Sequence, residues 1–293
     1  MDFSFKDFVH GNFDYDMKTK RHTGLWLREE NMDIGGGKIS FEDIDELSNY
    51  PETTVVTVSG LRQDTFEYFI EKYGKQLKAI RFFKNKFIED LSPLSSLPNL
   101  EYLYFFANQC VTSLWNMSRN ISLTALCIED FSRLHSIGNI QTAPNLKEFC
   151  IGNAIWNKMC MDSFLPLADT KIEHLSFTGK KIADNNYSFL ESMPELRSFD
   201  FPLNFLTTEQ VAWIVSNYPH LKGYALCAKV DFELYKSNSD PQLVPGAIIV
   251  GKRKPSLKVE GNEQRIQKYI DHFEVLKAQY KGLKYYEAFP CDS

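Results

Sequence analysis

The chain has 293 residues, of which 43% are hydrophobic and 24% are charged, and its formal net charge is −5. This composition is typical of a folded globular protein, and the acidic balance argues against a nucleic-acid binder, which needs a basic surface. No apolar run approaches the ~18 residues of a membrane span. The first residues also lack the basic and apolar parts of a secretory signal. We therefore expect a cytoplasmic protein with no nucleic-acid and no membrane partner.

Residues 1–52 are predicted to form an N-terminal cap. The segment is aromatic and irregular as far as Ser40, which precedes acidic residues and begins a predicted helix that ends at Leu47. Gly37 and Lys38 resemble part of a phosphate-binding loop. That motif needs Ser or Thr directly after the Lys, and Ile39 stands there instead, so we do not predict a phosphate site.

Residues 53–229 repeat one hydrophobic pattern. Its clearest copy is Leu100-Glu-Tyr-Leu103-Tyr-Phe105-Phe-Ala-Asn108, which reads L-x-x-L-x-L-x-x-N. Copies start at positions 53, 77, 100, 123, 146, 172, 196 and 221. Each copy predicts one short strand, and a proline two residues before several copies, such as Pro98, favours an extended approach to that strand.

The segments between the predicted strands differ in length. Apolar residues at helical spacing predict helices over 63–73 and 208–217. Shorter segments such as 91–97 predict turns or 3-10 helices. The terminal asparagine of the pattern is present as Asn85, Asn108 and Asn204, whereas Phe131, Ala154 and Lys180 replace it in the middle copies. We therefore expect an interrupted ladder of buried asparagine hydrogen bonds.

Eight copies in phase resemble the leucine-rich repeat superfamily, and the Leu-Pro-Asn-Leu joints resemble internalin-type and related bacterial repeats. The resemblance implies an α/β fold. It would be a curved, right-handed solenoid with a parallel concave sheet of eight or nine strands, a convex face of helical and 3-10 segments, and a cap at each end. It also implies protein–protein binding on the concave face.

Residues 230–293 are predicted to form the C-terminal cap. Residues 244–249 and 257–259 have the pattern of weak strands, the first a possible ninth strand of the array. Asn262 precedes an amphipathic helix that is expected to run to about Tyr280 and to seal the last repeat. The three cations in 251–255 are interpreted as a guard against edge pairing, with an anion-binding patch as the alternative.

Side chains that flank the buried leucines face out of the concave sheet, because strand side chains alternate. Four aromatic residues and one arginine cluster on two neighbouring strands, namely Phe83, Tyr102, Tyr104 and Phe106 with Arg81. Residues of these types are enriched at binding hot spots. An equal alternative to a binding patch is that the N-terminal segment folds over this cluster and buries it. Both interpretations hold if the N-terminal segment can be displaced. Further candidate binding residues on this face are Glu129, Glu148, His174 and Asp200.

The concave face also carries residue types that occur in enzymes. Cys127 and Cys150 are neighbours in one outward column, and Cys150, His174 and Asp200 contain the groups of a thiol catalytic set. Diagonal neighbours on a sheet lie ~7 Å apart and a sheet offers no free amide donors, so we predict no catalytic and no metal site.

The function predicted from these patterns is a non-enzymatic scaffold that binds a protein partner, without a cofactor and as a monomer. Two alternatives remain open at this point. One is an enzyme or enzyme regulator that uses the cysteine and histidine residues of the concave face, and the other is a structural repeat protein without a defined partner.

Overall fold

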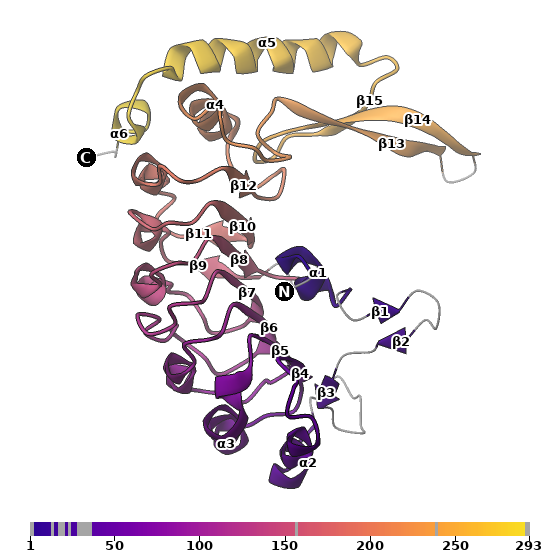
Figure 1. The fold of residues 1–293 in the computed structure, drawn as a ribbon. Helices are drawn as coiled ribbons and strands as arrows, with labels where there is room; N and C mark the ends of the chain where they lie inside the picture. The colour runs from indigo at the N-terminus through magenta and orange to yellow at the C-terminus, as the bar shows by residue number, and fades with distance from the viewer. Residues whose placement is uncertain are drawn as a thin grey trace. The chain divides into compact units, whose positions relative to one another are not determined.

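The computed structural model describes residues 3–12, 15–16, 21–22, 25–27, 37–155, 158–237 and 240–290. Its central feature is an eight-stranded sheet in the order β12-β10-β8-β7-β6-β5-β4-β3 (Figure 1). The strands are β3 (Leu25–Leu27), β4 (Val55–Val58), β5 (Ala79–Phe83), β6 (Tyr102–Asn108), β7 (Ala125–Phe131), β8 (Glu148–Gly152), β10 (His174–Thr178) and β12 (Ser198–Asp200). The pairs from β3 to β8 are parallel, and spatial order follows chain order, as in a solenoid.

The connections return over the convex side as helices or short 3-10 segments. The two longest are α3 (Gln63–Tyr73) and α4 (Thr208–Asn217), which confirms both predicted helices to the residue. Between the middle strands lie η3 (Ser92–Ser96), η4 (Gly138–Thr142), η5 (Leu165–Leu167) and η6 (Ser188–Ser192). At the start of the array, α2 (Phe41–Asp45) is capped by Ser40 and continues as the 3-10 helix η1 (Glu46–Asn49).

Local chemistry explains where α4 begins. The Thr207 hydroxyl accepts a hydrogen bond from the Gln210 amide at 3.2 Å, and the Gln210 side chain accepts one from the Thr207 amide at 3.0 Å. This reciprocal pair satisfies two amides that the first turn leaves unpaired. Val211 and Ile214 then point into the core and are fully buried.

The core is a stack of inward side chains from consecutive strands. Val56, Ile80, Leu103, Leu126 and Phe149 lie opposite one another in register, and each is at most 1% exposed. The spacing of the repeats predicts this column correctly. A single repeat buries little of its own apolar surface. The inward side chains become buried when repeats stack, because those of the neighbouring turns cover them.

The asparagine ladder follows the predicted interruption. Asn85 accepts from the Leu61 amide at 2.8 Å and donates to the Val58 carbonyl at 2.9 Å. Asn108 donates to the carbonyls of Asn85 and Ile88 and accepts from the amides of the two residues that begin the next connection. At Phe131 a buried ring replaces the amide.

Beyond Phe131, the turn after β8 uses Asn153, one residue before the predicted position 154. Its Oδ1 accepts from the amides of Lys158 and Met159, and its Nδ2 donates to Asp130 at 2.8 Å. Asn204, the third asparagine of the pattern, is exposed. The one-residue offset explains why the sequence pattern missed Asn153.

At the ends of the array, one predicted strand is absent and one unpredicted strand is present. The copy that starts at Leu221 forms no strand: it contributes only a bridge between Lys222 and Ser198 and then turns. A side chain on Gly223 would approach the Phe199 carbonyl oxygen to 2.3 Å, so the backbone packs too closely there for an ordinary strand residue. At the other end, Leu25–Leu27 adds a strand that the irregular N-terminal sequence did not indicate.

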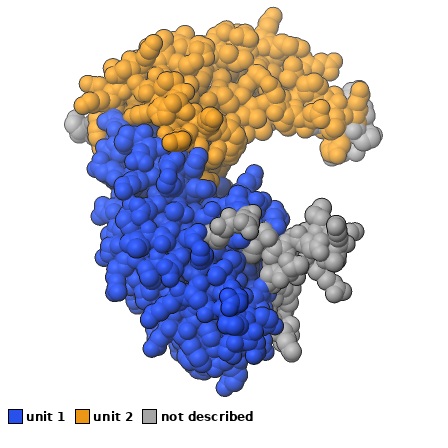
Figure 2. All heavy atoms as spheres, in the orientation of Figure 1, with its two compact units in different colours: residues 1–174, 178–195 blue, residues 175–177, 196–293 orange. Residues whose placement is uncertain are grey.

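The chain divides into two compact units (Figure 2). Unit 1 contains residues 1–174 and 178–195, and unit 2 contains residues 175–177 and 196–293. Besides α4, unit 2 contains β13 (Lys229–Ser237), β14 (Asp240–Ile249), β15 (Ser256–Lys258), α5 (Glu263–Tyr280) and α6 (Tyr285–Ala288). The strands predicted at 244–249 and 257–259 exist, but they belong to an antiparallel sheet in the order β13-β14-β15 and do not extend the parallel one.

The helix α5 packs against α4 within unit 2. Trp213 donates from Nε1 to the Leu283 carbonyl at 2.9 Å, and Asn217 donates to the Tyr280 carbonyl at 3.0 Å. Phe273 and Leu276 are buried on the inner face of α5. The predicted amphipathic helix therefore covers the last convex helix of the repeats.

Candidate functional site on the concave face

A short N-terminal helix, α1 (Phe5–His10), lies on the concave side of the sheet in unit 1 (Figure 1). Ser4 caps it by accepting a hydrogen bond from the Asp7 amide at 3.1 Å. Gly11 ends it with a φ of 71°, a left-handed conformation that glycine adopts without strain. Phe5 and Phe8, three residues apart on one face, are 3% and 0% exposed.

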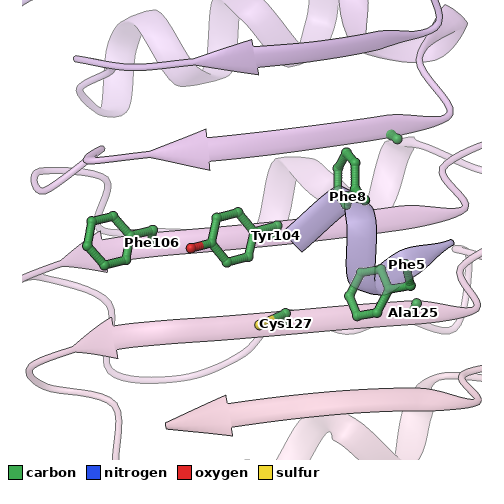
Figure 3. Packing of buried hydrophobic residues seen from close by; sticks show 7 residues of the cluster. Phe5, Phe8, Tyr104, Phe106, Ala125 and Cys127 are labelled. Atoms are coloured by element: carbon green, nitrogen blue, oxygen red, sulfur yellow. The ribbon is translucent and has the colours of Figure 1, made fainter. Parts of the chain in front are cut away.

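These two phenylalanines pack on the outward side chains of the sheet (Figure 3). The buried cluster that they join consists of Phe5, Phe8, Ala79, Tyr104, Phe106, Ala125 and Cys127. The Tyr102 ring lies 5.3 Å from that of Phe5 and 5.9 Å from that of Phe8. Ala79 and Ala125 flank Tyr102 in register on the two neighbouring strands, and their short side chains leave room on both sides of its ring.

Arg81 connects the sheet to the end of α1. Its Nη2 donates to the Val9 carbonyl oxygen at 3.1 Å, and its guanidinium lies 5.1 Å from the centre of the Tyr104 ring and 5.6 Å from that of Trp26. The side chain is only 4% exposed. A side chain on Gly11 would come within 3.1 Å of Nη1, so this glycine both turns the chain and leaves space for the arginine.

The polar edge of the cluster contains a carboxylate. The Tyr104 hydroxyl donates to Glu129 Oε2 at 2.8 Å. Burial raises the pKa of Glu129, although the Tyr104 hydrogen bond lowers it, and burial raises the pKa of Tyr104 as well. The pair thus combines a hydrogen bond with an incompletely solvated negative charge.

The structure places the predicted residues as follows. Arg81, Tyr104 and Phe106 are buried, Phe83, Tyr102, Glu129 and Glu148 are half-buried, and His174 is exposed, all in unit 1. Asp200 belongs to unit 2, where it is half-buried and accepts from the Tyr224 amide at 3.3 Å. For the aromatic cluster, the N-terminal segment is a cover, as one of the two alternatives predicts.

One outward position was misjudged. Cys127 does point out of the concave sheet, but it is 1% exposed because α1 lies over it. The expectation that it is a solvent-facing residue is therefore wrong. Sequence reasoning also missed Phe5 and Phe8 themselves, although Ser4 and Asp7 at capping distance and Gly11 after one and a half turns are signals of a short helix.

The buried Cys127 thiol is poorly suited to catalysis. Burial, followed by a hydrogen bond with Cys150, raises the pKa of the Cys127 thiol well above its usual value, and a neutral thiol is a weak nucleophile. Both cysteines are free and lie opposite each other in register. Within the ranges that the structure describes, no group of three or more histidine, cysteine and acidic side chains is arranged to hold a metal ion.

The basic segment 251–255 forms the turn between β14 and β15. The three cations therefore lie in a turn and not on an edge strand, where the interpretation as an edge guard placed them. Lys254 lies 5.5 Å from the centre of the Tyr269 ring on α5. No helix in the described part of the chain is long and apolar enough to cross a bilayer.

The repeats and the parallel strands decide the architecture. The chain has the leucine-rich repeat fold. No protein-family model matches the chain, and no curated protein matches its sequence. Among solved structures it is similar to an internalin from Listeria monocytogenes, with 20% identity and a TM-score of 0.49. The match covers 66% of this chain and 52% of the internalin chain, so this chain spans about half of that structure.

Proposed function

We propose that this chain is a non-enzymatic scaffold that binds a protein partner on its concave face. The observation that supports this proposal is the docking of α1, because the concave side chains already hold a helix by side-chain packing. Tyr104 and Phe106 are 5% and 8% exposed beneath it. Aromatic side chains on the outward face of a sheet are suited to protein recognition, in which tyrosine and arginine residues dominate the binding energy.

The proposed surface has an aromatic part and a polar part. The aromatic part is the cluster of Arg81, Phe83, Tyr102, Tyr104 and Phe106, and the polar part consists of Glu129, Glu148 and His174, all in unit 1. Burial raises the pKa of Glu148 while the neighbouring His174 lowers it, so a partner that covers this carboxylate must supply a donor or a cation. Charged groups of this kind select partners and steer association more than they add affinity.

Nucleic acid is not the partner in this proposal, because the net charge of −5 disfavours a polyanion. An enzymatic role is also not proposed. The Cys127 thiol is held neutral by burial, and catalysis by a cysteine requires a thiolate with a base in reach. The scaffold is proposed to act in the cytoplasm, as a monomer and without a cofactor.

Affinity capture with concave and convex variants tests the proposal. Glu148→Lys reverses a charge on the polar part of the face, and Lys75→Glu is the matched reversal at an exposed position on the convex 3-10 helix η2 (Gly74–Gln76). We expect proteins captured by the wild type to be lost with Glu148→Lys and retained with Lys75→Glu, at equal melting temperatures. Identical capture by all three proteins would contradict a concave binding face.

A further inference from the structure

We propose that α1 acts as an internal ligand, and that the site beneath it binds a short amphipathic helix of the partner protein. This partner helix carries two phenylalanines that are three residues apart. This inference rests on the proposed function and specifies the chemistry of the partner. The partner helix would replace α1 on the aromatic cluster.

The shape of the site is the first argument. Ala79, Tyr102 and Ala125 lie in register on β5, β6 and β7, so one large ring stands between two small side chains. Phe5 and Phe8 pack beside that ring and are both buried. Side chains three apart on a helix lie on the same face, which is the arrangement that this surface fits.

The polar contact at the end of α1 is the second argument. The last carbonyl groups of a helix have no partner within the helix and carry partial negative charge. Arg81 donates to one of them, at Val9, from a buried position. The contact involves only the backbone of α1, so a helix of different sequence can make it. It also fixes the direction, because the C-terminal end of the helix must face Arg81.

The small size of α1 is the third argument. It has six residues, whereas isolated helices shorter than ~12–15 residues are marginal in water. Its helical form therefore depends on docking to the sheet. A partner helix that displaces α1 removes its docking and its helical form together. Phe5 and Phe8 provide the anchors, while Lys6, Asp7 and His10 are exposed. Because α1 is tethered to the sheet that it covers, a competitor must overcome a high effective concentration.

A labelled peptide with the sequence of residues 3–12 tests this proposal on the full-length chain. In the double variant Phe5→Ala/Phe8→Ala the internal helix lacks its anchors, so we expect the peptide to bind at least roughly tenfold more tightly than to the wild type. Lys6→Ala changes an exposed residue of the same helix and should match the wild type. A peptide with alanine in place of Phe8 should bind neither protein.

Hydrogen exchange provides a second measurement that needs no variant. Excess peptide added to the wild-type chain should accelerate exchange of the amides of residues 5–11, because the displaced helix loses its hydrogen bonds. Equal peptide binding to the wild type and the double variant, or no effect on exchange at saturating peptide, would overturn the inference.

The outcomes separate this inference from the proposed function. If the peptide displaces α1 but partner capture does not depend on Glu148, the helix site stands and the polar part of the proposed binding face fails. If capture depends on Glu148 but the peptide does not bind, the partner uses the polar part of the face and the helix inference fails.

Discussion

The Arg81 guanidinium and the Val9 carbonyl oxygen, 72 residues apart in the chain, meet at 3.1 Å. This contact links the last turn of α1 to the second strand of the repeats. Since both groups lie in a covered region, the bond is stronger than its exposed equivalent.

Replacing Arg81 by methionine should undock α1 while the solenoid stays folded. The change removes a charge-assisted hydrogen bond worth about 1.5–3 kcal/mol and keeps most of the side-chain volume. Amide exchange of residues 5–11 should accelerate, with little change in the main melting transition. Lys78→Met, at an exposed position next to the same strand, is the control. Unchanged exchange in Arg81→Met would show that phenylalanine packing alone holds the helix.

Leu126→Asp should unfold the array. Leu126 is fully buried between Leu103 and Phe149, so the substitution places an uncompensated carboxylate in the core at a cost of several kcal/mol. Cys127→Ser, one residue further on, should leave the melting temperature of the repeats nearly unchanged and loosen α1, which covers it. Denaturant unfolding and amide exchange distinguish the two effects. A similar loss of stability in both variants would contradict the assignment of inner and outer faces.

Asn108→Ala should destabilise the chain much more than Asn99→Ala. Asn108 is buried and its side chain makes four hydrogen bonds to backbone groups, which become unsatisfied when it is removed. We expect a loss of roughly 2–4 kcal/mol in the free energy of unfolding. Asn99 is exposed and donates to the Lys75 carbonyl at 3.1 Å. Equal urea midpoints for the two variants would refute the structural role of the ladder.

The carboxylate of Asp45 should make unfolding sensitive to acid. Lys72 at 2.6 Å and the hydroxyls of Tyr68 and Tyr73 at 2.7 Å all donate to its Oδ1. The Lys72 hydrogen bond is the main cause that lowers the pKa of Asp45 from 3.8 to about 2. Because the folded pKa lies below the unfolded one, the stabilisation is complete above the unfolded value and is lost as the pH falls to the folded value.

Asp45→Asn provides the corresponding measurement. The variant should be less stable than the wild type at neutral pH, and the difference in urea midpoint should disappear between about pH 4 and pH 2. A difference that does not depend on pH would mean that packing around Asp45, and not its charge, stabilises the region.

Removal of residues 255–293 should yield a protein that aggregates. The deletion uncovers the face of α4 against which α5 packs, and it removes the acceptor of the Trp213 hydrogen bond, the Leu283 carbonyl. Phe273→Asp, a milder change at a side chain that is 3% exposed, should lower the melting temperature in the same direction. Monodisperse monomer in size-exclusion chromatography of the deletion would show that the cap lies elsewhere.

Sequence reasoning predicted the structure correctly where the same position is buried in every repeat. The inward column from Val56 to Phe149 was predictable because each turn of the solenoid buries the same position against its neighbours. Helix α4 was predictable because its cap and its apolar spacing are local. These features depend on residues close in sequence or on a regular period.

The features that the sequence did not predict depend on contacts between distant residues that do not recur from repeat to repeat. Nothing near Cys127 in the sequence indicates that it shares a buried cluster with Phe5, more than a hundred residues earlier. Likewise, the copy at Leu221 has the apolar residues of a strand, but the close packing of Gly223 on the preceding strand redirects the chain. The candidate site was therefore predictable as a set of outward residues, with a cover by the N-terminal segment as one of two alternatives, but the helix α1 and its contacts were not predictable.

Occupation of the concave face by α1 changes how any affinity for that face should be interpreted. A ligand that needs the uncovered face binds with an apparent dissociation constant equal to its intrinsic one multiplied by one plus the docking equilibrium constant. A docking free energy of about 2.7 kcal/mol would weaken the apparent affinity roughly a hundredfold. Protein that has lost residues 1–12 to a protease would then appear to be the tighter binder, although its binding surface is identical.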